Sequence, residues 1–331
     1  MSSDRSKILV TGGAGFIGSA FVRKLTAQGY VPLVVDSLTY AADLERLAEV
    51  RENIRLYKAS ISDAKGFEKI IKKENVSCII NFAAETHVDR SIKDSLPFLQ
   101  TNILGVHTLL QLARKYQIPK VIHISTDEVY GEIKEGAFDE DSPLAASSPY
   151  AASKASADLL IRSHIRTYGL PAIIVRPSNN YGPWQYPEKF IPFALLRLMK
   201  GKSLPVYGEG KNIREWLYVD DCAQGIFDVF TQGQSGEIYN LGGSEEKANI
   251  EVAQTLLDAM GMPMDTVEFV KDRPGHDLRY RLNSRKIAEQ IGFKPRITLV
   301  EGLRRTVDWC LEHKDWMLSK YDQINKLYGY K

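Results

Sequence analysis

The feature that most constrains the fold is a cluster of glycines directly after a short apolar run. Residues 7–10 read KILV and residues 11–18 read TGGAGFIG, after which apolar side chains recur at helical spacing. Strand, tight loop and helix in this order let the backbone approach a pyrophosphate, which the unpaired N–H groups of the helix N-terminus bind. The sequence therefore predicts a dinucleotide-binding loop, formed by Gly12, Gly15, Phe16, Ile17 and Gly18.

The same alternation of apolar run and helix continues along the first half of the chain. Apolar runs of strand length recur at residues 31–35, 54–57, 78–82, 120–124 and 172–176, and helical patterns cover about 97–116 and begin again near residue 150. Continuous apolar strands that alternate with helices indicate a parallel sheet covered on both faces. We therefore predict an α/β fold with a Rossmann-type, doubly wound parallel sheet.

After residue 182 the regular alternation of apolar strands and helices ends, which indicates a second, smaller lobe. Prolines crowd the loop at residues 183–192, and short strands then mix with separate helices. We predict a Rossmann domain over residues 1–182, to which residues 211–243 return, and an interleaved mixed α/β substrate lobe over residues 183–331.

Asp36 ends the second predicted strand, where an acid selects the cofactor. A carboxylate there accepts hydrogen bonds from the ribose hydroxyls and repels a 2′-phosphate, so the expected cofactor is NAD. The alternative is a structural turn beside a solvated aspartate.

Composition excludes several other classes of protein. The 331 residues include 43 basic and 41 acidic ones, so no net field attracts nucleic acid or a membrane surface. Three cysteines without paired spacing suit a reducing compartment, and no run of 18 apolar residues is present. The polar N-terminus does not read as a signal peptide. We expect a cytoplasmic protein with no nucleic-acid or membrane partner and no metal.

Tyr150 and Lys154 stand four residues apart at the start of a predicted helix, which puts the phenol and the ammonium on one face. A neighbouring cation favours the phenolate and lowers the pKa of a tyrosine, so Tyr150 could take a proton from a substrate hydroxyl. Taken in isolation, these two residues could instead be an ordinary pair on the surface with no catalytic role.

With its glycine loop and its Tyr-x-x-x-Lys pair, the chain resembles the extended short-chain dehydrogenase/reductase family, over essentially its whole length. The resemblance implies work on a nucleotide sugar through a 4-keto intermediate, with Thr126 as the third catalytic residue. It also implies cofactor contacts at Ser60, Ile61 and Ala83. Ser60 is a departure, because relatives usually carry an acid there to meet the adenine.

Asp127 and Glu128 are neighbouring acids at the end of a buried strand, where charge is costly. Oxidation of carbon 4 of a hexose acidifies the proton on carbon 5, so a base there and an acid at carbon 6 would together expel water. The pair resembles that of the nucleotide-sugar 4,6-dehydratases that act on dTDP-glucose, in which Glu128 would be the base and Asp127 the acid. The alternative is a turn cap and a solvated loop acid.

The same resemblance implies residues that hold the nucleotide sugar, and a homodimer that pairs the helices near 97–116 and 150–168. The substrate residues are His87, Asn179, Glu188, Lys189, Tyr207, Arg214, Arg273 and His276. The other histidines, His107, His123, His164 and His313, are expected to be structural.

Other readings stay open within the same family and outside it. Pro177 stands where enzymes acting on dTDP-glucose usually carry a small residue, and proline there is common in UDP-sugar epimerases. The open alternatives are a 4,6-dehydratase of UDP-glucose or UDP-N-acetylglucosamine, a UDP-sugar epimerase or decarboxylase, and a sensor or scaffold that keeps the NAD fold without turnover.

Overall fold

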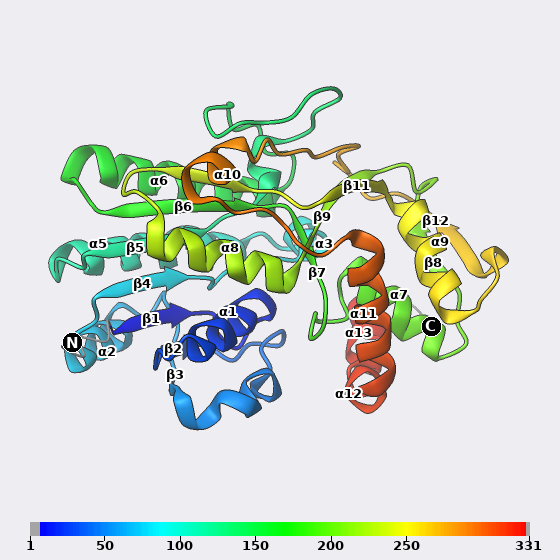
Figure 1. Cartoon of the computed structure of the whole chain (residues 1–331), viewed down its shortest axis with the longest axis horizontal. Helices are drawn as coiled ribbons and strands as arrows, with labels where there is room; N and C mark the ends of the chain where they lie inside the picture. Colours follow the sequence, from blue (N-terminus) through cyan, green and yellow to red (C-terminus); the bar gives the residue numbers. More distant parts are fainter. Residues whose placement is uncertain (1–6, 329–331) are drawn as a thin grey trace.

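The centre of the molecule is a parallel sheet of seven strands. The structure is a computed structural model and describes residues 7–328. The sheet has the order β10-β6-β5-β4-β1-β2-β3 (Figure 1), and every neighbouring pair is parallel. The strands are β1 (Ile8–Thr11), β2 (Leu33–Asp36), β3 (Arg55–Lys58), β4 (Cys78–Asn81), β5 (Lys120–Ile124), β6 (Ala172–Pro177) and β10 (Ile238–Leu241).

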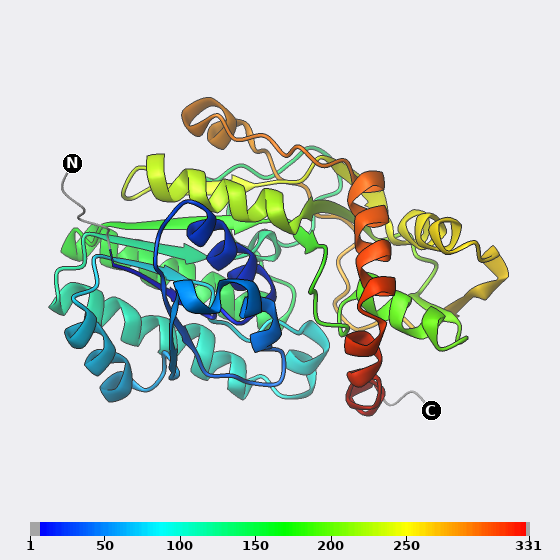
Figure 2. The same ribbon diagram turned by 60° about the horizontal axis from the view of Figure 1, so that its bottom comes forward.

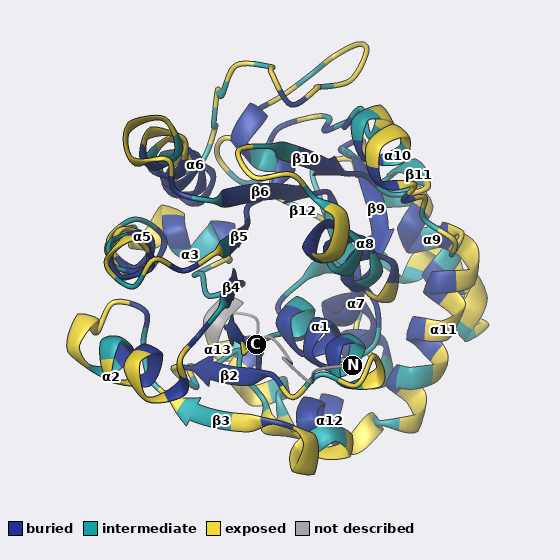
Figure 3. Cartoon of the chain, turned by 60° about the vertical axis from the view of Figure 1, so that its left-hand side comes forward, coloured by how far each residue is buried: buried dark blue, intermediate teal, exposed yellow. Residues whose placement is uncertain are grey.

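Helices cover both faces of this sheet (Figures 2 and 3). One face carries α1 (Phe16–Ala27) and α8 (Val219–Gln232), and the other carries α2 (Ala64–Glu74), α5 (Val106–Lys115) and α6 (Pro149–Tyr168). Successive strand residues point to opposite faces, so Val10 packs in the core beneath α1 and Leu9 packs in the core beneath α5. The predicted Rossmann-type fold is confirmed.

The helix predicted over about 97–116 is one continuous helical segment with an irregular middle. It consists of α4 (Leu96–Phe98), a π-helical turn at Leu99–Gly105, and α5. Asn102 lies in the π-helical turn, and its buried amide binds the backbone N–H and C=O of Glu85 and the hydroxyl of Ser153. The turn therefore joins this helix to the loop after β4 and to α6.

The second half of the chain builds a smaller lobe beside the sheet. It holds a three-stranded sheet of β11 (Glu245–Ala248), β9 (Ile213–Tyr218) and β7 (Asn179–Tyr181), and a pair formed by β12 (Val267–Val270) and β8 (Leu204–Tyr207). Its core packs α7 (Phe190–Met199), α9 (Asn249–Met260) and α11 (Leu299–Glu312) together. Between β9 and β11 the chain returns to the large sheet through α8 and β10. The domain boundaries themselves stay a prediction.

Short elements complete the chain and close the region between the two parts. They are α3 (Val88–Lys93), α10 (Arg285–Ile291), α12 (Lys314–Ser319), α13 (Tyr321–Tyr328) and the 3-10 turns at Leu44–Asn53, Asp127–Tyr130 and Met264–Thr266.

Arg46 is buried and donates hydrogen bonds to the carbonyls of Ala14, Ala41 and Trp184. It thereby ties the glycine loop to the lobe. Within residues 7–328, no helix is long and apolar enough to cross a membrane.

Candidate active site

A cavity of about 540 Å³ lies at the carboxyl ends of the strands of the large sheet and is closed on its other side by the lobe. Ligands of open α/β sheets bind at this edge, because the loops that follow parallel strands converge there. Every residue that the sequence predicts for the site lines this cavity: Gly12, Gly15, Phe16, Ile17, Gly18, Asp36, Ser60, Ile61, Ala83, His87, Thr126, Asp127, Glu128, Tyr150, Lys154, Asn179, Glu188, Lys189, Tyr207, Arg214, Arg273 and His276. The fold thus brings the predicted residues together, while their individual roles stay predictions.

The glycine loop has the shape that a bound pyrophosphate needs. Gly12 has a positive φ of 68°, and a Cβ there would lie 2.7 Å from the backbone nitrogen of Ala83. A Cβ at Gly18 would lie 2.2 Å from the carbonyl oxygen of Gly12. The N-terminus of α1 has no side-chain cap, so its N–H groups face the cavity mouth without competition from a cap. The loop fits a dinucleotide phosphate.

Asp36 is buried at the end of β2 and is already oriented by the backbone. Its two carboxylate oxygens accept hydrogen bonds from the N–H groups of Ala14, at 2.9 Å, and Leu38, at 2.8 Å. Burial raises the pKa of this carboxyl group, and the two backbone hydrogen bonds act in the opposite direction. Each oxygen keeps a further lone pair, so the residue fits a ribose diol.

The two neighbouring acids follow β5 in a 3-10 turn that Thr126 caps. The Thr126 hydroxyl accepts a hydrogen bond from the N–H of Glu128 at 3.3 Å and donates one to Oδ1 of Asp127 at 3.2 Å. Asp127 is 3% exposed, whereas Glu128 keeps part of its surface open to the cavity. The alternative interpretation, a turn cap beside a solvated loop acid, therefore does not describe this pair.

Their surroundings distinguish the two carboxyl groups electrostatically. Burial raises the pKa of Asp127 well above its ordinary value, and the charges of Glu128 and Glu215 raise it further. Burial also raises the pKa of Glu128, but the cations Arg273, Lys189 and Arg214 oppose that rise. The pKa of both carboxyl groups is raised, and more cations oppose the rise at Glu128, so Asp127 is the better candidate for an acid and Glu128 for a base.

Tyr150 and Lys154 lie on one face of α6, and the effect of the lysine charge on the tyrosine stays a prediction, because other groups dominate the pKa of Tyr150. Burial raises the pKa of Tyr150, and the neighbouring charges of Glu128 and Asp127 raise it further, while a hydrogen bond with Thr126 lowers it. The Lys154 amine instead donates to the carbonyl of Ile124 at 2.6 Å. Helical spacing fixes the shared face but not the direction in which the ammonium points.

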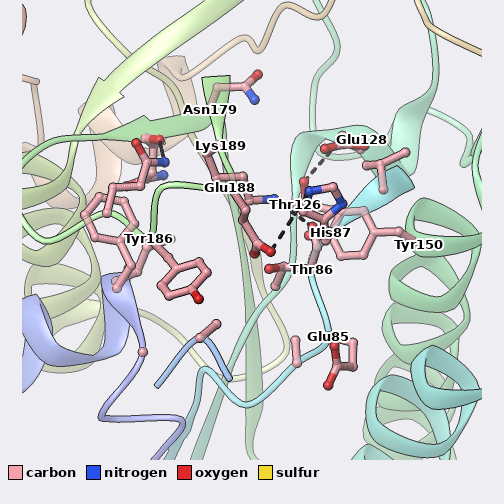
Figure 4. Close-up of a pocket in the computed structure, with 18 of the residues that line it drawn as sticks. Glu85, Thr86, His87, Thr126, Glu128, Tyr150, Asn179, Tyr186, Glu188 and Lys189 are labelled. Carbon is pink, nitrogen blue, oxygen red and sulfur yellow. Dashed lines mark hydrogen bonds and ion pairs between the residues drawn. The ribbon is translucent and has the colours of Figure 1, made fainter. Parts of the chain in front are cut away.

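Residues of the loop after β4 and of the loop before α7 meet across the cavity (Figure 4). Nε2 of His87 lies 4.0 Å from a carboxylate oxygen of Glu188, and Lys189 donates to the carbonyl of Thr86 at 2.8 Å. Burial lowers the pKa of His87 to about 2, and the nearby positive charge of Lys189 contributes to this shift. His87 is therefore neutral at physiological pH.

The cations predicted to meet a diphosphate already have protein partners. Arg214 donates to the carbonyls of Ile213 and Asp277, and its guanidinium lies over the Tyr280 ring. Arg273 pairs with Asp89 at 3.6 Å.

Tyr207 and His276 form the neighbouring wall of the cavity. The Tyr207 hydroxyl donates to Asp89 at 3.2 Å, and its ring meets that of His276 edge to face. His276 in turn pairs with Asp272 at 2.6 Å.

Several lining residues were not predicted from the sequence. Glu85 and Asp89 flank His87 in one short segment, so the segment itself could have signalled them. Tyr186 and Tyr280 also line the cavity, but nothing in their local sequence distinguishes them from core tyrosines.

Some buried polar atoms on the cavity wall have no protein hydrogen-bond partner among the described residues. They are Oδ2 of Asp127, Oδ1 of Asn179, the hydroxyl of Tyr186 and Nε of Arg273. Buried polar groups are nearly always satisfied, so a cavity that collects such atoms is suited to a ligand rich in hydroxyl and phosphate oxygens.

Comparison with known proteins agrees with this geometry. Residues 9–306 match the family model described as GDP-mannose 4,6 dehydratase. The dTDP-glucose 4,6-dehydratases of Streptomyces niveus and Neisseria meningitidis are 45% and 47% identical, each over 94% of this chain and 94% of the relative. The solved structure of a dTDP-glucose 4,6-dehydratase from Streptomyces venezuelae, DesIV, has NAD bound; it is 47% identical and superposes with a TM-score of 0.91 over 94% of this chain and 98% of that one.

Proposed function

This chain belongs to the dTDP-glucose 4,6-dehydratase family, and we infer from that membership and from the cavity that it converts dTDP-glucose to dTDP-4-keto-6-deoxyglucose, with NAD as its internal redox cofactor. The observation that carries this function is the buried pair Asp127 and Glu128, in the same cavity as Thr126 and Tyr150. An oxidoreductase that acts only at carbon 4 would need no second acid and base.

NAD would be held by the glycine loop at its pyrophosphate and by Asp36 at its adenosine ribose, with Ser60, Ile61 and Ala83 lining the remainder. When bound, it supplies the acceptor for the hydride of carbon 4, and the same hydride is later returned to carbon 6. The protein's part is to bind, to orient and to move protons.

The first proton to move is that of the carbon 4 hydroxyl. Tyr150 accepts this proton, and Thr126 hydrogen-bonds the same hydroxyl and orients it. Tyr150 must be a phenolate before it accepts the proton, and Lys154, one helical turn beyond it, would supply the nearby positive charge that favours this form. The buried setting of all three side chains supports this role, because charge interactions are stronger away from water.

Loss of water requires a base and an acid at adjacent carbons. The Glu128 carboxylate takes the carbon 5 proton, and protonated Asp127 gives its proton to the carbon 6 hydroxyl, which leaves as water. Glu128 would then return its proton to carbon 5 as the double bond between carbons 5 and 6 is reduced. The three cations that oppose the pKa rise of Glu128, against one at Asp127, support this division of roles.

The nucleotide part of the substrate would lie against the lobe. Arg214 and Arg273 would meet the diphosphate, Tyr207 and His276 the base, and Asn179, Glu188, Lys189 and His87 the sugar and its adjoining phosphate. The unpartnered Oδ1 of Asn179 and Nε of Arg273 support a polar ligand at these positions.

We also propose a cytoplasmic homodimer. Exposed apolar side chains gather on the helices from α3 to α6: Ile92, Leu96, Leu99, Leu104 and Leu159. Such a group of apolar side chains is typical of a protein interface. Cys78, Cys222 and Cys310 are free, buried thiols, which suits a reducing compartment.

Incubation of the purified protein with dTDP-glucose, UDP-glucose and GDP-mannose, followed by mass spectrometry of each nucleotide sugar, tests the function. We expect loss of one water from dTDP-glucose, with no added oxidant. Unchanged mass for all three sugars would refute the dehydratase, and loss of water from another sugar alone would move the substrate assignment to that nucleotide.

A further inference from the structure

A line of buried hydrogen bonds runs beneath Lys154 from the sheet. Thr11 at the end of β1 donates to Oδ1 of Asn81 at 2.5 Å, Nδ2 of Asn81 lies 2.9 Å from Nδ1 of His123, and Nε2 of His123 lies 3.2 Å from the Lys154 nitrogen. All four side chains are at most 2% exposed. The line therefore works without water and ends on a proposed catalytic residue.

Each member of this line can exchange the donor and acceptor roles. In one arrangement the Thr11 hydroxyl donates to Asn81, the Asn81 amide donates to Nδ1 of His123, and the Nε2–H of His123 donates to a neutral Lys154 amine. In the other, the Asn81 amide is reversed and accepts the Nδ1–H of His123, so that Nε2 accepts from a Lys154 ammonium. Both arrangements keep the bonds of the line, and they differ by a half-turn of the Asn81 amide, which exchanges its oxygen and nitrogen, and by the positions of the protons.

The other groups around Lys154 do not compete for this role. Its nitrogen also donates to the carbonyl of Ile124 at 2.6 Å, which is possible in both charge states. The titratable neighbours on α6 are Tyr150 and Asp158, one turn before and after, and Asp158 is paired with Arg176 at 2.9 Å. On β5 the facing group is His123.

The pKa of Lys154 is close enough to physiological pH for both its charged and its neutral form to be populated. Burial lowers the pKa of Lys154 to about 8, and the charge of Asp158 opposes this shift. Burial and the nearby Lys154 charge keep the pKa of His123 well below its ordinary value, so the imidazole stays neutral and only its tautomer changes.

We propose that Thr11, Asn81 and His123 form a reversible hydrogen-bond chain that holds the Lys154 nitrogen in one place in both its charged and its neutral form. His123 is then a positioning residue for the Lys154 and Tyr150 pair, and not merely a core histidine. The proposal rests on the proposed function for the use of that pair in catalysis, but the chain itself can be tested without turnover.

The test is to measure the pKa of Lys154 by NMR in the full-length protein, labelled with ¹³C at the lysine ε-carbon. The Lys154 resonance is assigned from its loss in Lys154→Met. His123→Phe removes the acceptor for the ammonium, so the pKa of Lys154 should fall by about one pH unit. Asn81→Asp holds the proton on Nδ1 of His123 and leaves Nε2 as an acceptor, so the pKa should rise. Because the carboxylate of Asn81→Asp attracts the Lys154 charge in any case, the signature of the chain is opposite shifts together with an Nδ1-protonated His123 in the ¹⁵N spectrum of Asn81→Asp.

His164→Phe is the matched control, since His164 is a buried histidine of α6 outside this line, and it should leave the Lys154 titration unchanged. Shifts in the same direction in His123→Phe and Asn81→Asp, or none in either, would overturn the proposal. If His123→Phe does not fold, Asn81→Asp decides alone, and an unchanged or lowered pKa there is contrary to the chain.

A kinetic readout separates this proposal from the proposed function. In each variant the alkaline limb of the pH profile for formation of reduced cofactor should move with the Lys154 titration, while KM for the sugar stays unchanged. If no variant or wild-type protein reduces its cofactor with any sugar, the proposed function fails, and the NMR titration still decides whether the chain exists.

Discussion

At the residue scale, stability and chemistry make opposite demands on Asp127. A carboxyl group that is 3% exposed, beside Glu128 and with an unpartnered Oδ2 among the described residues, costs free energy whenever it ionises. In the proposed mechanism, the fold tolerates this cost because an acid is needed at this position to expel a hydroxyl. Such a group is expected to lower the stability of the protein while serving its function.

The first prediction concerns the stability of Asp127→Asn. The unfolded chain releases this proton near pH 4, whereas the folded protein retains it, so wild-type stability falls as the pH rises above about 4. The amide cannot ionise, so Asp127→Asn should melt roughly 2–4 °C above wild type at pH 8, with a smaller difference at pH 5. Thermal unfolding at both pH values measures this. The same substitution at exposed Asp141 should change neither value, and a pH-independent difference at position 127 would contradict the reasoning.

A second prediction at this scale concerns the cofactor. Asp36→Ala removes the acceptor for the ribose hydroxyls and for the N–H groups of Ala14 and Leu38, so NAD affinity should fall at least about tenfold. Release of nucleotide from denatured, freshly purified protein gives the occupancy. Asp141→Ala serves as the control. Equal occupancy in both variants would remove Asp36 from the cofactor site.

At the scale of elements, the loop from β1 into α1 depends on contact between backbones. Gly18→Ala would place a methyl group 2.2 Å from the Gly12 carbonyl oxygen, so α1 must shift and NAD binding should be lost. Gly29→Ala meets nothing within 4 Å, and only its positive φ makes it costly, by about 1 kcal/mol. NAD occupancy of both purified variants is the measurement. Retention of NAD by Gly18→Ala would show that the loop does not need the close approach.

The sequence predicted those elements whose signal is local. The apolar strands and the glycine loop are continuous patterns, so β1 to β6 were recognised with ends that differ by at most two residues, and β5 with the same bounds. Strand β2, for example, begins at Leu33, because Pro32 before it lacks an N–H for the ladder. The three-stranded sheet of β7, β9 and β11 was not predicted. Its three-residue strand Asn179–Tyr181 is recognisable only through its distant partner, β9.

The candidate site was predicted as a set of residues, and less well as a geometry. Motif spacing placed Tyr150 beside Lys154, but not the Lys154 amine against the carbonyl of Ile124. Likewise no local pattern pairs Arg273 with Asp89, because the two lie far apart in sequence and meet only across the cavity. Side-chain direction depends on tertiary partners, which a single sequence does not display.

At the scale of the whole molecule, the exposed apolar group on the helices from α3 to α6 should bury itself against a second copy. Leu104 is 58% exposed there, so Leu104→Lys should shift the protein from dimer toward monomer in sedimentation velocity. Leu311→Lys, at a side chain 47% exposed on α11, is the matched control and should leave the assembly unchanged. A wild-type monomer, or a dimer untouched by Leu104→Lys, would contradict the interface.

In the proposed mechanism, Asp127 is the acid that expels water after carbon 4 is oxidised. The direct measurement is the absorbance of reduced cofactor in Asp127→Asn mixed with dTDP-glucose. Because in this mechanism carbon 4 oxidation uses Tyr150 and water loss uses Asp127, reduced cofactor should accumulate while product formation slows by about 10²-fold or more. Tyr150→Phe, as the control, should accumulate none. Equal loss of both steps in Asp127→Asn, or normal product formation, would contradict the claim.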